Sequence, residues 1–292
     1  MKVVTHSGNF HADEVMAVAM LCILYGLREV SRVRRVSLDD MESRSTIVID
    51  IGGEHDPRRG NFDHHQKGGA GKRPSGVPYA AFGLVWAEYG SLLVRELFPD
   101  LMEDEVDLVF HKFDKEFVAL VDGVDTGHSG APDKAHIART ISSFNTSWWE
   151  EGDEEDAFEE ALEVAEKVLK RQLEHTAASV AAQEEISRSP VEGRVLVLDR
   201  YVPIMDLEIE DDILYVVYPS NRGSWMVQQI PVKPGSFEGR KKLPKSWAGL
   251  KGQELADECG VEDAVFCHNG RFIGGADTKT GAIEMAQIAV EA

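Results

Sequence analysis

The segment KVVTHSGNFHADEVMAVAMLCILYG, residues 2–26, indicates the fold class. Its first five residues are rich in β-branched side chains and end at His6, which is typical of a strand. Residues 11–26 carry a broad apolar face and predict a helix. The longest apolar run, residues 15–27, is too short to cross a bilayer and fits a helix buried in a core.

The same alternation of strand and helix continues along the first half of the chain. STIVID, residues 45–50, is a continuous apolar run before Gly52 and Gly53, as expected for a buried parallel strand. A partly exposed strand is predicted at residues 30–36, and helices at 79–93 and within 103–121. This order predicts βαβ units, so we expect an N-terminal parallel-sheet domain with flanking helices over residues 1–150.

The second half of the chain has a different character. Residues 154–186 lack Pro and Gly and repeat apolar side chains at helical spacing, which predicts a helical linker over residues 151–189. The runs RVLVLD, ILYVVYP, WMVQQIP and AVFCHN then predict strands, and residues 281–290 predict a final helix. We therefore expect a smaller C-terminal mixed α/β domain at residues 190–292, and the α/β class for the whole chain.

Composition restricts the classes of function. The chain has 292 residues, 43% of them hydrophobic, and a net charge of −20, which argues against nonspecific binding to nucleic acid. Seven basic residues against one acid in residues 221–251 nevertheless leave a local place for an anion. The N-terminus lacks the pattern of a signal peptide, so we expect a cytoplasmic protein with no membrane partner. The three cysteines have no CxxC spacing and are expected to be reduced core residues.

Four groups of polar residues follow predicted strands or turns. They are His6, His11 and Asp13 in THSGNFHADE; Asp50 in VID; Asp63, His64 and His65 in NFDHHQ; and Asp122 and Asp125 in VDGVDTG. Each residue alone has an ordinary explanation, such as a satisfied core histidine or an acid in the first turn of a helix. Together they predict a site for two divalent metals such as Mn²⁺, because such metals accept imidazole and carboxylate ligands and sites form beyond the carboxyl ends of parallel strands.

The ordered set HSGNFHADE, VID, DHH and VDGVDTG resembles the DHH phosphoesterase superfamily. More closely, THSGNFHADEVMA, NFDHHQKGG, GVPYAAFGLVW and CHNGRFIGGADTKTGAIEMA resemble the Myg (melanocyte proliferating gene) family, over nearly the full length. The resemblance implies a catalytic DHH domain, a helical linker, a smaller substrate-binding domain and an active site in the cleft between the domains. It also implies a phosphodiesterase, a 3′→5′ exonuclease acting on RNA with Mn²⁺ as the metal; Mg²⁺, Co²⁺ and Zn²⁺ are alternatives.

The resemblance assigns roles to the N-terminal residues by position. The implied metal ligands are His6, His11, Asp13, Asp50, His64 and Asp125, with Asp122 as second choice for the last place. Asp50 is the expected bridging ligand. His65 is expected to stabilise charge on the phosphate, and Asp63 completes the catalytic group.

Substrate contacts are expected mainly in the C-terminal domain. Arg222, Lys241, Lys242 and Lys245 would form a basic path, and His268 and Arg271 would lie beside backbone N–H groups of Gly274 and Gly275 that approach a phosphate. Trp225 and Trp247 either stack on bases or belong to the core. Near the N-terminal site, Lys67, Lys72 and Arg73 are interpreted as a rim that faces an anion.

Two other functions compete with RNA cleavage. The net charge of −20 also suits a phosphoesterase for a small nucleotide, a cyclic dinucleotide or pyrophosphate. A metal- or nucleotide-binding module without catalysis ranks third, because all the ligand positions are filled. A peptidase has no support, since neither HExxH nor a nucleophile elbow is present. A homodimer is compatible with the sequence, which does not fix the oligomeric state.

Overall fold

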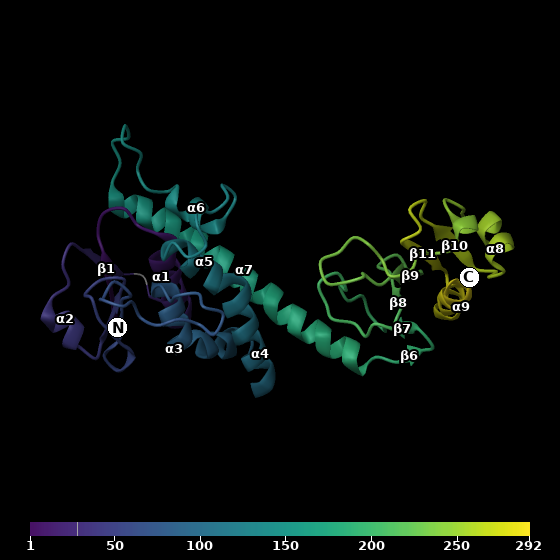
Figure 1. Cartoon of the computed structure of the whole chain (residues 1–292), viewed down its shortest axis with the longest axis horizontal. Helices are drawn as coiled ribbons and strands as arrows, with labels where there is room; N and C mark the ends of the chain where they lie inside the picture. The colour runs from purple at the N-terminus through teal and green to yellow at the C-terminus, as the bar shows by residue number, and fades with distance from the viewer. Residues whose placement is uncertain (28) are drawn as a thin grey trace. The chain divides into compact units, whose positions relative to one another are not determined.

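A computed structural model describes residues 1–27 and 29–292 (Figure 1). Contacts along the chain divide it into two units, Met1–Ala177 and Ala178–Ala292. Each unit has its own sheet and helices, which confirms the α/β class.

The sheet of the first unit has the strand order β2-β1-β3-β5-β4. Its strands are β1 (Lys2–His6), β2 (Val30–Val33), β3 (Thr46–Ile49), β4 (His55–Asp56) and β5 (Asn61–Phe62). The first four in spatial order are parallel, as predicted, whereas β4 at the edge runs antiparallel to β5. Only a single 3₁₀ turn and Gly60 connect β4 to β5, and so short a connection cannot return the chain for parallel pairing.

In the described part of this unit, six helices precede α7 and cover the sheet or pack beside it. They are α1 (Ala12–Tyr25), α2 (Leu38–Glu42), α3 (Ala81–Leu97), α4 (Glu103–Phe113), α5 (Ala119–Asp125) and α6 (Ile137–Ser142). The predicted α1 is confirmed, and every residue from Ala12 to Cys22 is buried, because α1 packs against β3 and against α3, α5 and α6. α1 is therefore the centre of the core, and its first turn is fixed at the carboxyl end of β1.

Helix α7 (Glu154–Arg188) is the predicted long helix, and the division between the units falls within it. Its apolar positions Phe158, Ala165, Leu169 and Leu173 are buried. The ring of Phe158 meets that of Phe10 edge to face, with centroids 5.5 Å apart. The first part of α7 is thus packed into the first unit, whereas the sequence set residues 151–189 apart as a linker.

The second unit contains a mixed sheet, the end of α7 and two further helices. The strand order is β10-β11-β9-β8-β7-β6, and only β7 and β8 pair in parallel. The strands are β6 (Val191–Glu192), β7 (Val195–Val197), β8 (Tyr215–Pro219), β9 (Trp225–Gln229), β10 (Ala264–Cys267) and β11 (Ile273–Ala276); the helices are α8 (Gln253–Cys259) and α9 (Lys279–Glu291). The core includes Tyr215, Val227, Trp247 and Met285.

The three cysteines are buried and free, as expected. No helix within residues 1–27 and 29–292 is both long and apolar enough to cross a lipid bilayer.

Candidate metal centre

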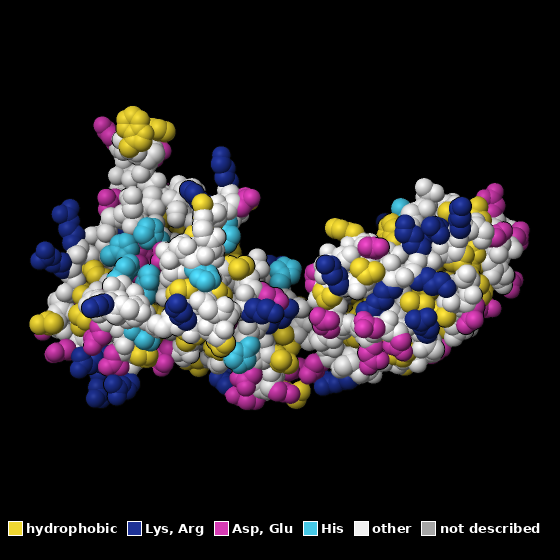
Figure 2. Space-filling view, in the orientation of Figure 1, with side chains coloured by type: hydrophobic (Ala, Val, Ile, Leu, Met, Phe, Trp, Pro, Cys, Tyr) yellow, Lys and Arg dark blue, Asp and Glu magenta, His cyan; other side chains and the backbone are white. Residues whose placement is uncertain are grey.

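Parallel strands bring three of the predicted groups to one edge of the first sheet. His6 is the last residue of β1, Asp50 follows β3, and His64 follows β5 by two residues. Because β1, β3 and β5 are neighbours and parallel, their carboxyl ends lie side by side. The start of α1 adds His11 and Asp13, and Asp125 arrives as the last residue of α5. In Figure 2, histidine side chains gather at one place on the visible face of the first unit.

The carboxylate of Asp50 lies between two imidazole rings. Its Oδ2 is 3.4 Å from Nε2 of His6, and its Oδ1 is 3.1 Å from Nε2 of His64. Nε2 of His64 is also 3.2 Å from Oδ2 of Asp125 and 3.8 Å from Oδ2 of Asp13. One carboxylate therefore offers a different oxygen to each of two groups of ligands.

Among residues 1–27 and 29–292, four sets of three possible ligand atoms have all their atoms within 4.8 Å of one another. The sets are Asp50, His64 and His65; His6, Glu14 and Asp50; His11, Asp13 and Asp50; and Asp13, His64 and Asp125. Asp50 is in three of the four sets, which makes it the centre of the arrangement. The ligand group, as the term is used below, consists of His6, His11, Asp13, Glu14, Asp50, His64 and Asp125.

Glu14 is a member that the sequence reasoning missed. Its Oε2 lies 2.9 Å from Nε2 of His6 and also accepts a hydrogen bond from the Thr5 hydroxyl at 2.7 Å. Its Oε1 accepts a hydrogen bond from the His11 backbone N–H, as in a capping box. An acid in the first turn of a helix is explained locally by such a cap. Its burial beside His6 indicates that the Glu14 carboxylate also belongs to the candidate metal centre.

Three buried atoms of this group have no hydrogen-bond partner among the described residues: Oδ1 of Asp13, Oδ1 of Asp50 and Nε2 of His64. The last two approach each other at 3.1 Å without hydrogen-bond geometry. Buried polar atoms are almost always satisfied, so three orphaned atoms at one place need a common partner. Nδ1 of His6 lies 3.2 Å from the Ser7 carbonyl, which leaves Nε2 of His6 as the ligand atom. These donors fit divalent cations that accept nitrogen and oxygen ligands.

The backbone of Asp50 is also unusual. Its φ is 57°, in the left-handed region, although it is not glycine. Such a conformation is uncommon and clusters at functional sites. Its N–H donates to the Phe62 carbonyl at 3.0 Å, so the end of β5 holds Asp50 in place.

The ionisable groups of the centre have displaced pKa values. Burial would lower the pKa of His6, but contacts with carboxylates, Asp50 first, raise it to about 10. Burial also opposes protonation of His64, whereas Asp125 and Asp50 raise its pKa to about 10. Burial would raise the pKa of Asp50, but His6 and His64 lower it to about 2. Burial and the charges of Asp50 and Asp125 raise the pKa of Asp13 well above its usual value. Without a cation, the protonated imidazoles of His6 and His64 carry the positive charge that balances these carboxylates. A bound cation would displace the imidazole protons.

Asp63 and His65 form a second layer beside Asp50. Oδ1 of Asp63 accepts a hydrogen bond from the His65 backbone N–H at 3.0 Å and lies 2.8 Å from Nδ1 of its ring. The other carboxylate oxygen accepts a hydrogen bond from the Gly53 N–H. Asp63 therefore orients His65, whose side chain is 60% exposed, and the turn after Asp50. Asp63 belongs to none of the four ligand sets found in the described part of the chain.

Of the two competing aspartates, the structure brings Asp125 into the ligand group and not Asp122. Asp122 is fully buried and pairs with Arg73, with 2.8 Å between Oδ2 and Nη1. Arg73 also pairs with Asp114 at 2.8 Å and is only 5% exposed. The interpretation of Arg73 as an anion-facing rim is therefore wrong, because its charge is already neutralised inside the unit.

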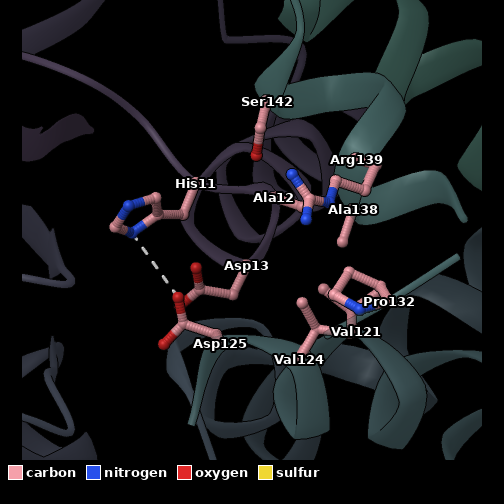
Figure 3. A pocket seen from close by; sticks show the side chains of 10 residues that line it. All are labelled: His11, Ala12, Asp13, Val121, Val124, Asp125, Pro132, Ala138, Arg139 and Ser142. Atoms are coloured by element: carbon pink, nitrogen blue, oxygen red, sulfur yellow. Dashed lines mark ion pairs between the residues drawn. The ribbon is translucent and has the colours of Figure 1, made fainter. Parts of the chain in front are cut away.

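A pocket of about 280 Å³ opens beside the ligand group (Figure 3). His11, Asp13 and Asp125 of the centre form part of its wall. The other lining residues are Ala12, Val121, Val124, Pro132, Ala138, Arg139 and Ser142. A substrate bound there would meet the candidate metal ligands directly.

The two glycines predicted to contact a phosphate lie inside a strand of the second unit. Gly274 and Gly275 are buried inside β11, where their backbones pair with β9 and β10. A side chain at Gly275 would meet the Trp225 carbonyl oxygen at 2.6 Å. These glycines allow strands to pack closely, which differs from the expected exposed phosphate-binding backbone.

Of the basic residues predicted to contact substrate in the second unit, two donate hydrogen bonds within the unit and two line pockets. Lys241 donates from Nζ to the Val290 carbonyl at 2.8 Å, and Arg271 donates to the Leu243 carbonyl at 3.2 Å. Lys242 lines a pocket of about 430 Å³, and Arg222 lines another of about 390 Å³.

The remaining candidates of this unit are aromatic or lie near an aromatic ring. His268 is exposed and its ring lies 4.5 Å from that of Phe272. Trp247 is 2% exposed and belongs to the core, whereas Trp225 is half-buried at the edge of the core with Nζ of Lys279 5.3 Å from its ring.

Known proteins match this chain over almost its whole length. The family model MYG1_exonuc, described as "Uncharacterised protein family (UPF0160)", matches residues 2–290. The MYG1 protein C27H6.8 of Caenorhabditis elegans is 32% identical over 322 residues, which cover 98% of this chain and 94% of that protein. The MYG1 exonuclease of Homo sapiens is 30% identical over 316 residues, with 97% and 84% covered. The MYG1 exonuclease of Rattus norvegicus is 31% identical over 316 residues, with 97% and 83% covered. This chain therefore belongs to the MYG1 exonuclease family, UPF0160.

Proposed function

We propose that this protein is a metal-dependent phosphodiesterase of the DHH type, a 3′→5′ exonuclease that acts on RNA with Mn²⁺ as its cofactor. The observation that carries the proposal is the placement of Asp50, whose two carboxylate oxygens face His6 and His64 separately. A carboxylate so placed is suited to bridge two cations. The relatives named exonucleases support the same class of reaction.

The ligand group would hold the cations. Its members in this proposal are His6, His11, Asp13, Glu14, Asp50, His64 and Asp125. Two divalent cations held there would activate a water molecule and neutralise charge on the phosphate. Glu14 joins the set on its distance to His6, and Asp122 leaves it because it pairs with Arg73.

His65 shares one of the four sets with Asp50 and His64, but in this proposal it acts on the phosphate and not on a cation. Asp63 holds its Nδ1, so Nε2 is the nitrogen left to contact a substrate oxygen. In the protonated ring, Nε2–H can donate to the charge that develops on that oxygen. Asp63 is a positioning residue in this scheme, because it acts through His65.

A direct test compares substrates and metals with the purified chain. End-labelled RNA and DNA of the same sequence are incubated with Mn²⁺, Mg²⁺, Co²⁺ or Zn²⁺, and products are resolved by length. We expect stepwise shortening of RNA from the 3′ end with Mn²⁺, and its loss in Asp50→Asn and His64→Ala. Asp100→Asn, an exposed aspartate on a loop, is the control and should retain activity. Equal activity in all these variants would overturn the site assignment.

A small substrate is the second candidate, and two observations favour it. The pocket beside the centre measures about 280 Å³, and the chain has a net charge of −20, which repels a long polyanion. The same assay with a cyclic dinucleotide, a short dinucleotide and pyrophosphate separates the two candidates. Faster cleavage of these than of long RNA would favour the small substrate. Metal binding with no cleavage of any substrate would favour a non-catalytic binding module.

A further inference from the structure

We propose that the pocket beside the candidate metal centre binds one terminal nucleotide of the substrate, with Arg139 as the contact for its phosphate. This inference rests on the proposed phosphodiesterase function and names the substrate unit that the same site accepts.

The pocket has two chemically different walls. His11, Asp13 and Asp125 of the ligand group lie on one side. Arg139 and Ser142 of α6 lie across from them, and Figure 3 shows the guanidinium of Arg139 and the hydroxyl of Ser142 directed toward the space between the walls. An anion in the pocket would therefore meet a cationic side chain opposite the proposed cations.

The side chain of Arg139 is exposed on the wall of the pocket. Its guanidinium makes no hydrogen bond or ion pair with any residue that the structure describes, although Asp13 and Asp125 line the same pocket. Arg73, in the same unit, shows the contrast, because it pairs with both Asp114 and Asp122. A guanidinium binds phosphate oxygens through its planar donors, so Arg139 is suited to a phosphate that enters the pocket.

Asn145 fixes the two walls relative to each other. Its side-chain amide donates to the Phe10 carbonyl at 2.8 Å and to the Ser142 carbonyl at 3.1 Å. Its Oδ1 accepts from the Phe10 N–H at 2.9 Å. The end of α6 is thus tied to the segment that precedes His11. Arg139 and His11 are therefore held on opposite sides of a pocket of defined width.

The size and the apolar lining indicate what else the pocket accepts. Its volume of about 280 Å³ lies just below the range of about 300–1,000 Å³ for small-molecule sites, so one nucleotide is a suitable occupant and a folded polymer is not. Val121, Val124, Pro132 and Ala138 provide apolar contacts for a sugar or a base. The Ser142 hydroxyl adds a polar group for a sugar hydroxyl. The matching chemical class is a nucleoside monophosphate unit.

Equilibrium binding tests the role of Arg139 without relying on turnover. Isothermal titration calorimetry in Mn²⁺ measures adenosine 5′-monophosphate, inorganic phosphate and adenosine binding to the wild type, Arg139→Gln and Arg139→Lys. A lost charge-assisted hydrogen bond corresponds to roughly ten- to a hundredfold weaker binding, which we expect for both phosphate-containing probes with Arg139→Gln. Arg139→Lys keeps the charge and should lose less. Arg44→Gln, which removes an exposed arginine before the amino end of β3, is the matched control and should bind normally.

A second variant tests the nucleoside part of the pocket. Ser142→Phe places a ring in the space that Ser142 faces, so we expect binding of adenosine 5′-monophosphate to fall to that of inorganic phosphate. Thermal unfolding and Mn²⁺ titration of each variant show whether its fold and metal binding are intact. Wild-type affinity for adenosine 5′-monophosphate in both Arg139→Gln and Ser142→Phe would overturn the inference, as would its failure to bind the wild type.

The two proposals can fail separately. Hydrolysis of bis(4-nitrophenyl) phosphate by the wild type reports on phosphodiester cleavage without a nucleoside in the pocket. If the wild type cleaves this diester but the variants bind nucleotide normally, the pocket assignment is wrong and the proposed function stands. If the wild type cleaves no phosphodiester but the variants lose nucleotide binding, the pocket assignment stands and the phosphodiesterase function is wrong.

Discussion

Nη1 of Arg73 lies 2.8 Å from Oδ2 of Asp122, and both side chains are buried. The second oxygen of Asp122 accepts a hydrogen bond from the Gly83 N–H at 3.0 Å, at the start of α3. This pair explains why two aspartates three positions apart have different surroundings. Asp122 connects helices inside the unit, whereas Asp125, at the end of the same helix, reaches the ligand group.

Removing Asp122 should therefore reduce stability. Asp122→Ala leaves the buried charge of Arg73 with Asp114 alone, so we expect a loss of about 3–5 kcal/mol in the free energy of unfolding, measured by urea denaturation. The double variant Arg73→Met with Asp122→Leu is the control, because it removes both charges, and it should be more stable than Asp122→Ala. A loss below about 1 kcal/mol in Asp122→Ala would show that the pair is not a structural one.

Removing Asp125 should instead weaken metal binding. Its Oδ2 lies 3.2 Å from Nε2 of His64, and its Oδ1 lies 3.5 Å from Nδ1 of His11. We expect Asp125→Asn to lower Mn²⁺ affinity by more than the roughly 10–100-fold that loss of an outer-shell partner costs, as measured by calorimetry. In the metal-free variant, relief of the repulsion between Asp125 and Asp13 offsets the lost contact with His64, so we expect the melting temperature to change little. Unchanged Mn²⁺ affinity would remove Asp125 from the ligand group.

The metal-free protein should lose stability in alkaline solution. The pKa values of His6 and His64 are raised from 6.5 to about 10, so the folded protein keeps protons that the unfolded chain releases. The stabilisation is complete below pH 6.5 and disappears as the pH rises toward about 10. Asp50 contributes in the opposite sense, because its stabilisation is present above pH 3.8 and disappears as the pH falls to about 2.

Melting curves in the presence of a chelator measure this effect. We expect the melting temperature to fall between pH 6.5 and 10 and the decrease to be smaller in His64→Gln. Saturating Mn²⁺ should reduce the slope, because a bound cation replaces the protons. A wild-type melting temperature that is constant over this range would contradict the pKa assignments.

Asp63 should affect catalysis through His65. Asp63→Asn removes the charge 2.8 Å from Nδ1 of His65, so the ring loses the contact that orients it. We expect kcat to fall roughly 10–100-fold with Mn²⁺ affinity unchanged. The double variant Asp63→Asn with His65→Gln should be no slower than His65→Gln alone. A further loss in the double variant would mean that Asp63 acts independently of His65.

Gly275 should act on stability. A Cβ there would lie 2.6 Å from the Trp225 carbonyl oxygen, which is backbone and cannot move aside cheaply. We expect Gly275→Ala to destabilise the chain by about 1–3 kcal/mol, as overpacking does, and to leave affinity for short RNA unchanged in the folded fraction. Normal stability combined with weaker RNA binding would restore the substrate-binding interpretation of this glycine.

The placement of several candidate residues could be predicted because they follow strand ends. His6, Asp50 and His64 each come at or just after a short apolar strand, and parallel strands bring such positions together. Glu14 was missed because the cap of α1 explains it locally. The pairing of Arg73 with Asp122 joins residues 49 positions apart, which no local pattern encodes.

The pocket had no sequence signal. Arg139 is an arginine in a six-residue helix, and only the packing of α6 against α1 places it opposite His11. The glycines of β11 were predicted to contact phosphate because their residue types suit a phosphate loop as well as a crowded strand. Motifs thus identified groups that sit on regular elements, and tertiary packing decided the remainder.

The amide of Asn145 sets the width of the pocket through hydrogen bonds that involve none of the candidate metal ligands. It contacts backbone atoms of Phe10 and Ser142 and no ligand side chain. The distance between α6 and the segment before His11 is thus an adjustable dimension of the molecule. A shorter or longer side chain at position 145 offers a route to re-engineer which substrates enter while every metal ligand stays in place.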